Sequence, residues 1–244
     1  MDIGKGTHGM REDWVDCNGV AIPYRYCHSR RRTLGMTVRP DKSVTVRAPL
    51  RTSLHAIRDF VTRRAAWIEK AWAEFDRRGP ATPQSYANGA HFLFRGAAYM
   101  LVIEQGAPES VRIEGASLVV TTTGEPSTER LRGLVDAWYR ERAGEIFGER
   151  LIECHRRMQP EGIALPPLLI RPMRSRWGSY SYRTRRIALN LNLIRLPQAS
   201  LDYVIVHELC HVNVRHHGPD FWRLVGRYVP DHAAMRRQLR ESVR

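Results

Sequence analysis

The sequence predicts an α+β protein, with a β-rich N-terminal half and a C-terminal half organised around a buried helix. Three observations predict this class. Short segments of alternating polar and apolar residues, typical of strands, occupy much of positions 18–125. A long amphipathic segment at about 127–158 then precedes three more strand-like segments. The last of these leads into an almost wholly apolar helix, which carries two histidines and a glutamate.

The N-terminal half divides at Gly79-Pro80, where the composition breaks a helix. Residues 1–17 are polar and predict a loose tail, and alternation predicts strands at 22–26, 34–38 and 44–46. Ser53 can cap one helix that runs to about residue 75. Beyond the break, strands at 92–94, 99–103, 111–113 and 118–122 predict a meander.

In the C-terminal half, the helix at about 127–158 is followed by strands at 168–171, 177–181 and 187–191. Ser200 is the predicted N-cap of the next helix, which must end near 213–215 because Gly218-Pro219 follow. Two short helices begin near Pro219 and Pro230. We therefore predict three regions: a tail at 1–17, a β-rich region with one helix at 18–125, and a motif-bearing region at 126–244.

The motif is H-E-x-x-H, from His207 to His211, with a further histidine at His217. Side chains at i and i+4 lie about 40° apart around a helix, so both imidazoles can reach one cation. Glu208 projects beside that cation and can act as a general base toward water. Histidine and glutamate in an apolar helix are costly to bury alone, which favours a metal. By position alone, either His216 or His217 could be the third ligand.

The flanking residues form a longer pattern. V-I-V-H-E-L-C-H begins at Val204, H-G-P-D-F-W begins at His217, and R-W-G-S-Y-S begins at Arg176. This pattern, over about residues 22–240, resembles the YgjP-like metallopeptidases, which are zincins related to the SprT and WLM groups. Tyr180 departs from the cysteine that the family usually has there. Metzincins are a poorer match, because Val214 replaces their glycine.

The resemblance implies a zincin-like catalytic half, one Zn²⁺ per chain and His217, rather than His216, as third ligand beside His207 and His211. It implies a zinc metallopeptidase with Glu208 as general base, acting on a peptide or protein. The strand at 177–181 could pair with an extended substrate. The candidate substrate-binding residues are Arg174, Arg176, Trp177, Tyr180 and His232.

Composition agrees with an intracellular globular enzyme. The 244 residues can bury a sizeable core, and four cysteines (Cys17, Cys27, Cys154 and Cys210) at unrelated spacings predict free thiols. Cys210, inside the motif, is expected to be a small buried residue. With no apolar run of transmembrane length and no apolar signal core, we predict a cytoplasmic protein without a membrane partner.

The net charge of +14 raises the alternative of nucleic-acid binding. The segment 162–201 contains no acidic residue, and its seven arginines are Arg171, Arg174, Arg176, Arg183, Arg185, Arg186 and Arg195. We expect this strip to face the cleft and favour acidic or DNA-associated protein substrates, although a solvated hairpin would look the same. The rival functions are a nucleic-acid-binding protein with a structural zinc, a DNA-associated protease, and hydrolysis of another bond such as a phosphoester.

Overall fold

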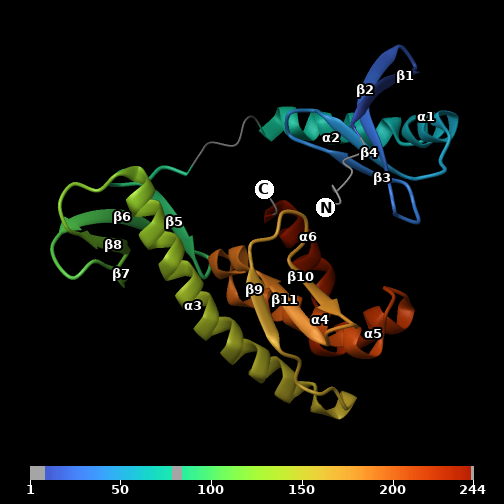
Figure 1. The fold of residues 1–244 in the computed structure, drawn as a ribbon. Helices are drawn as coiled ribbons and strands as arrows, with labels where there is room; N and C mark the ends of the chain where they lie inside the picture. The colour runs from blue at the N-terminus through green and yellow to red at the C-terminus, as the bar shows by residue number, and fades with distance from the viewer. Residues whose placement is uncertain (1–8, 79–83, 243–244) are drawn as a thin grey trace, which may run out of the picture. The chain divides into compact units, whose positions relative to one another are not determined.

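The computed structural model describes residues 9–78 and 84–242, which fall into two compact units, Met1–Pro83 and Gln84–Arg244 (Figure 1). The sequence suggested a division near residue 125 instead. The strands between 91 and 122 join the C-terminal unit because their apolar side chains enter its core. Leu101 and Leu118, for example, lie in one buried cluster with Leu131 and Val135.

The N-terminal unit is a sheet with two helices. Its elements are β1 (Arg11–Cys17), β2 (Val20–Ser29), β3 (Gly35–Val38), β4 (Val44–Pro49), α1 (Leu54–Thr62) and α2 (Ala65–Arg78). The strand order is β1-β2-β4-β3, in which β2 and β4 are parallel and the other pairs antiparallel. Ile22, Val46, Ile57, Val61 and Ile68 are fully buried between sheet and helices.

Two predictions for this unit were wrong. Residues 11–17 of the expected tail form β1, whose Val15 and Cys17 enter the core; residues 1–8 lie outside the described residues. Polar residues alternate with these two, which hides the strand in a sequence. The helix capped by Ser53 ends at Thr62, and a second begins at Ala65. Apolar spacing continues through this break, so periodicity could not reveal it.

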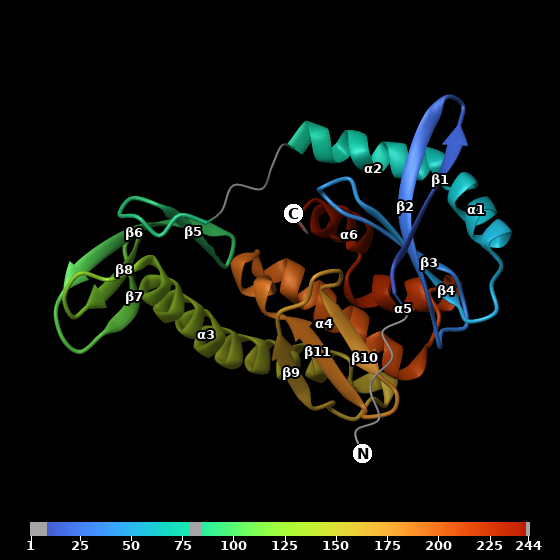
Figure 2. The same ribbon diagram turned by 45° about the horizontal axis from the view of Figure 1, so that its top comes forward.

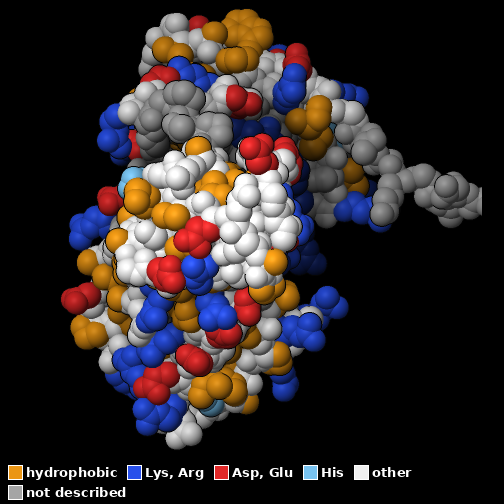
Figure 3. Space-filling view, turned by 90° about the vertical axis from the view of Figure 1, so that its left-hand side faces the viewer, with side chains coloured by type: hydrophobic (Ala, Val, Ile, Leu, Met, Phe, Trp, Pro, Cys, Tyr) orange, Lys and Arg blue, Asp and Glu red, His pale blue; other side chains and the backbone are white. Residues whose placement is uncertain are grey.

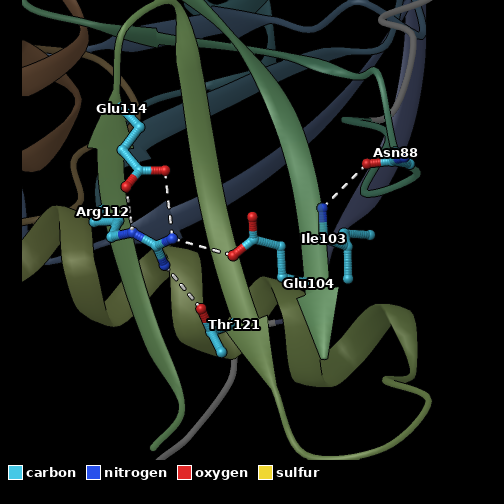
Figure 4. A network of polar contacts seen from close by, with 6 residues as sticks. All are labelled: Asn88, Ile103, Glu104, Arg112, Glu114 and Thr121. Atoms are coloured by element: carbon cyan, nitrogen blue, oxygen red, sulfur yellow. Dashed lines mark hydrogen bonds and ion pairs between the residues drawn. The ribbon is translucent and has the colours of Figure 1, made fainter. Parts of the chain in front are cut away.

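The C-terminal unit begins with β5 (His91–Phe94), β6 (Ala97–Gln105), β7 (Ser110–Glu114) and β8 (Ser117–Thr122). The order is β5-β6-β8-β7, with β6 parallel to β8, so the predicted meander is wrong. On the polar face of this sheet, the Arg112 side chain on β7 donates hydrogen bonds to Thr121 on β8 and to Glu104 on β6 (Figure 4). An apolar face lies against α3 (Thr128–Arg157).

Helix α3 spans 30 residues and begins as predicted, with the Ser127 hydroxyl accepting the N–H of Arg130. A short 3₁₀ turn, η1 (Gln159–Glu161), follows it. The N-terminal part of α3 lies beside the four-stranded sheet, and its C-terminal part extends away from that sheet toward the helix that carries the H-E-x-x-H motif (Figure 1). Arg150 on α3 donates two hydrogen bonds to Asp202, at 2.8 and 2.9 Å, so a largely buried ion pair links the two helices.

The second sheet of this unit contains β9 (Leu168–Arg171), β10 (Gly178–Ser181) and β11 (Arg186–Asn190), in the order β10-β11-β9 (Figure 2). Strand β11 is parallel to β9 and antiparallel to β10. Among the described strands β10 pairs with β11 alone, so no described strand covers its other edge. A 3₁₀ turn, η2 (Leu191–Arg195), leads from β11 to the next helix.

Helix α4 (Gln198–Asn213) carries the motif and is buried nearly all round. Its N-cap is Pro197 and not Ser200, which is buried within the first turn. The predicted C-terminal end near 213–215 is confirmed. Helices α5 (Pro219–Tyr228) and α6 (His232–Ser242) complete the unit. In the described ranges, no helix is both long and apolar enough to span a bilayer.

The tight turn between β5 and β6 docks on the residues that precede α4. Arg95 and Gly96 both have positive φ, of 50° and 85°, and their N–H groups donate to Ile194 and Arg195 carbonyls. A Cβ on Gly96 would lie 2.8 Å from Cγ and 3.1 Å from Cα of Pro197. Only glycine satisfies both the turn conformation and this contact.

We expect Gly96→Ala to reduce the free energy of unfolding by more than the roughly 1 kcal/mol attributable to a left-handed alanine. Chemical denaturation measures this. Gly115→Ala is the matched control, because Gly115 also has positive φ (55°) but no atom within 4 Å of its added Cβ. Equal losses in the two variants would show that the contact with Pro197 contributes nothing.

Candidate metal centre and active site

Three histidine side chains converge at the C-terminal end of α4. His207 and His211 lie one turn apart on the helix, and the chain reverses after Asn213 to bring His217 back to them. Nε2 of His217 lies 3.0 Å from Nε2 of His207 and 3.1 Å from Nε2 of His211. All three candidate ligand atoms lie within 4.8 Å of one another. The neighbouring His216 is not part of this cluster.

An aromatic pair in the first turn of α5 holds this cluster in place. Phe221, which is fully buried, contacts all three imidazole rings at centroid distances of 4.5–4.9 Å. Trp222 stacks on His217 and donates its indole N–H to the backbone carbonyl of His217, at 3.1 Å. The loop between α4 and α5 is therefore fixed by side chains that follow it directly in sequence.

The environment keeps these imidazoles neutral, the form that binds a metal. Burial, followed by the two neighbouring histidines, lowers the pKa of His207 to about 3. Burial also lowers the pKa values of His211 and His217. The Nδ1 atom of His211 lies 3.0 Å from the carbonyl of Val214, which orients the ring so that Nε2 points toward the other two histidines.

Glu208 is one of the few buried charged side chains, with 5% of its surface exposed. Its carboxylate lies against β10 and accepts the backbone N–H of Tyr180. Burial raises the pKa of Glu208 to about 7, while the Tyr180 N–H and the charge of Arg176 oppose this rise. A carboxylate with such a pKa can exchange protons near neutral pH, as general bases do.

The absence of a side chain at Gly178 allows β10 to approach α4. A Cβ added to Gly178 would lie 2.7 Å from Oε1 of Glu208 and 2.8 Å from Cγ1 of Val204. Atoms do not pack at such distances, so any larger residue would displace the carboxylate or separate the strand from the helix. The glycine of the R-W-G-S segment thus has a defined steric role beside Glu208.

Two cavities flank Glu208, and both are lined by Arg176, Gly178 and His207. The Tyr203 cavity, of about 300 Å³, is also lined by Trp177, Tyr203, Val204, Leu239 and two arginines of α6, Arg236 and Arg240. The Tyr182 cavity, of about 490 Å³, is lined by Tyr180, Tyr182, Arg215, His211 and His217. Together they form a groove that runs past the histidines and Glu208.

The five candidate substrate-binding residues have different positions. Arg176 lines both cavities, Trp177 lines the Tyr203 cavity, and Tyr180 lines the Tyr182 cavity. Arg174 lines neither of them and faces a third cavity. His232 stacks on the face of Trp222 at a ring distance of 5.4 Å, and it also lines neither cavity.

Several residues that surround the site could not be assigned a role from the sequence. In the sequence, Phe221 and Trp222 are part of the family pattern and have no assigned role. Their position shortly after His217 is nevertheless a local signal that they could support this histidine. Arg236 and Arg240 approach from α6, and no spacing rule links that helix to the motif. Cys210 is fully buried as expected, and burial raises the pKa of its thiol to about 12.

A comparison with curated proteins finds none that matches the sequence. The metallopeptidase zymogen abylysin of Pyrococcus abyssi is 19% identical, with a TM-score of 0.36, over 39% of this chain and 93% of that one. The metallopeptidase zymogen jannalysin of Methanocaldococcus jannaschii is 22% identical, with a TM-score of 0.33, over 41% and 96%.

The family comparison covers most of the chain. Residues 32–242 match a family model described as "YgjP-like, metallopeptidase domain". The prediction of an α+β fold is confirmed, and so is the prediction of a metallopeptidase domain. The chain therefore belongs to the YgjP-like family of metallopeptidases.

Proposed function

We propose that this metallopeptidase cleaves peptide bonds with one zinc ion, held by His207, His211 and His217, and with Glu208 as general base. The observation that carries the proposal is the position of the Glu208 carboxylate. It is buried beside three converging imidazole nitrogens, yet it is not one of the clustered ligand atoms. A carboxylate in that position can accept a proton from water without occupying a coordination position.

The donor set fits zinc. With Zn–N distances of about 2.0–2.1 Å, two ligands of a tetrahedral centre are separated by about 3.3 Å. The Nε2 separations of 3.0 and 3.1 Å between His217 and its two partners are close to that value. Three neutral imidazoles with no protein ligand in the fourth position are typical of catalytic rather than structural zinc sites.

Bound zinc would polarise the scissile carbonyl and lower the pKa of the attacking water. Glu208 takes the proton from that water as the new C–O bond forms, and it then transfers the proton to the leaving amine. Its pKa of about 7 suits both transfers. The Tyr180 N–H holds one carboxylate oxygen in place, so the geometry of the base is set before the substrate arrives.

The substrate has an available binding edge. Strand β10 borders Glu208, and an extended peptide could add to the edge that no described strand covers, using backbone groups other than the Tyr180 N–H that binds Glu208. The Tyr203 and Tyr182 cavities would then accept side chains on either side of the scissile bond. Arg176 lines both cavities and is the best candidate to stabilise the negatively charged oxygen in the transition state.

The alternatives have less support. A structural zinc in a nucleic-acid-binding protein usually has four protein ligands, whereas the described residues supply three in this cluster. Phosphoester hydrolysis usually depends on carboxylate-rich or two-metal sites, and among the described residues Glu208 is the only acidic one that lines the two cavities. A DNA-associated protease would use the same catalytic centre and would differ only in its partner.

Metal content tests the ligand assignment. After chelation and reconstitution, elemental analysis should find one zinc per chain in the parent protein. The His211→Ala, His217→Ala double variant should lose it, because two of three nitrogens are removed. His216→Ala is the control and should retain the metal, since His216 lies outside the cluster. Full zinc content in the double variant would contradict the assignment.

Glu208→Gln tests the general base. Glutamine has almost the same shape and cannot accept the proton, so we expect zinc content to be unchanged. The rate of peptide hydrolysis should fall at least 10²–10⁴-fold, the range that general acid–base catalysis contributes. Both quantities can be measured on one preparation. A rate within tenfold of the parent would show that another group is the base.

Gly178→Ala tests the close approach of β10 to Glu208. The added methyl group should displace the carboxylate, so hydrolysis should fall by roughly tenfold to a hundredfold while zinc remains bound. Gly226→Ala on α5 is the control, because its Cβ would make only ordinary contact, 3.6 Å from His232. Equal rates for parent and Gly178→Ala would mean that the carboxylate position does not limit catalysis.

A further inference from the structure

A third cavity in the C-terminal unit is lined by three arginines, of which only Arg176 has a role in the proposed mechanism. This Asn192 cavity has a volume of about 420 Å³, and its lining includes Arg174, Arg176, Arg195 and the amide side chain of Asn192. None of its lining residues is acidic. Leu93, Met173 and Trp177 supply an apolar wall beside these cationic groups.

The two arginines at 174 and 176 project from a loop that is held rigidly. Asn190, which is 4% exposed, donates from Nδ2 to the carbonyls of Met173 and Arg176, at 2.9 and 3.0 Å. Its Oδ1 accepts the N–H of Met173, and its own backbone N–H donates to the Trp177 carbonyl. These bonds fix both ends of the loop, so little conformational freedom remains to be lost on binding.

The guanidinium groups of Arg174 and Arg195 are available to bind an anion, and that of Arg176 is shared with the cavities at Glu208. In the described part of the chain, these three guanidinium groups form no ion pair or side-chain hydrogen bond, although the charge of Arg176 acts on Glu208. Arg195 is held instead by its position over the ring of Tyr139, 4.8 Å from the centroid. Several other arginines are paired with carboxylates, as Arg112 is in Figure 4, and Figure 3 shows acidic and basic groups interspersed on one face.

The Asn192 cavity is adjacent to the groove at Glu208. Arg176 and Trp177 line both it and the Tyr203 cavity, so these two side chains separate the two spaces. A peptide bound beside Glu208 could therefore place a nearby side chain or its C-terminus in the Asn192 cavity. The guanidinium of Arg176 would lie between that group and the catalytic carboxylate.

We propose that the Asn192 cavity is a subsite for a carboxylate of the peptide substrate, bound by Arg174, Arg176 and Arg195. This inference rests on the proposed function and specifies its substrate class. Guanidinium groups bind carboxylates through paired, charge-assisted hydrogen bonds. The Tyr203 cavity also contains arginines, but a carboxylate there would be next to Glu208 and would be repelled by it. Its walls of Trp177, Tyr203 and Leu239 suit an apolar side chain instead.

Of the seven arginines in the expected strip, only Arg174, Arg176 and Arg195 are assigned to the proposed subsite. Arg174 and Arg195 line the cavity, whereas Arg183 and Arg186 are exposed and line none of the three cavities. These two pairs carry the same charge and lie in the same segment of chain. They form a matched set for substitution, because each pair replaced by glutamine lowers the net charge by two.

The test measures binding by fluorescence anisotropy to the zinc-reconstituted Glu208→Gln protein and to the zinc-free parent, which keeps the Glu208 charge. The probes are labelled Ala/Gly octapeptides with one Glu at each position in turn, and the same peptides with Gln. A second set with free or amidated C-termini separates a side-chain carboxylate from the terminal one. One of these carboxylates should improve the dissociation constant about tenfold, the usual effect of a hydrogen bond to a charged group.

The Arg174→Gln, Arg195→Gln variant should reduce that preference to less than twofold, while Arg183→Gln, Arg186→Gln should retain it. Equal losses in the two variants would overturn the proposal in favour of general surface charge. If the Arg174→Gln, Arg195→Gln variant kept the carboxylate preference and an Arg236→Gln, Arg240→Gln variant lost it, the carboxylate would bind in the Tyr203 cavity. That result would also overturn the proposal. No carboxylate preference in the parent would have the same consequence.

Hydrolysis by the parent enzyme is measured separately, with the Gln peptides. A zinc-dependent rate without a carboxylate preference would overturn the subsite and leave the proposed function intact. A carboxylate preference without any hydrolysis would overturn the peptidase proposal and leave only a carboxylate-binding cavity. The two failures therefore give different results.

Discussion

The contact between α4 and β10 determines what the rest of the site can do. It buries the Glu208 carboxylate against a strand that has only hydrogen at position 178, and it directs the Tyr180 N–H at that carboxylate. Burial alone would favour the protonated acid. The N–H group and the charge of Arg176 oppose that tendency, so the pKa stays near neutrality. A larger residue at 178 would remove both the burial and the hydrogen bond together.

A different set of contacts positions the histidines. The helix provides His207 and His211, but His217 depends on a loop, and loops vary in conformation unless something holds them. Phe221 contacts all three rings and Trp222 binds the backbone of His217, so the first turn of α5 acts as the support. The base and the metal ligands are thus held by separate elements, β10 and α5, that meet at α4.

The sequence predicted what depends on local spacing. Helix α3 and the end of α4 follow from periodicity, the pairing of His207 with His211 follows from the motif, and His217 follows from the family resemblance. The sequence did not predict contacts between segments that lie far apart in the chain. The parallel contact of β6 with β8 and the membership of β5–β8 in the C-terminal unit depend on partners that no local pattern specifies. The approach of Gly178 to Glu208 belongs to the same class.

The arginines show both this limit of sequence-based prediction and the information that the structure provides beyond it. A net charge of +14 and an acid-free segment before α4 describe a strip, but they do not say which of its charges are available. Several arginines on the four-stranded sheet and on α3 are paired with carboxylates, as Arg112 is with Glu104 and Arg150 with Asp202. The charge of such an arginine is already balanced within the protein. Around the Asn192 cavity, no described carboxylate pairs with Arg174 or Arg195. Substrate preference can be inferred from these two groups, because an anionic ligand would supply the missing negative charge.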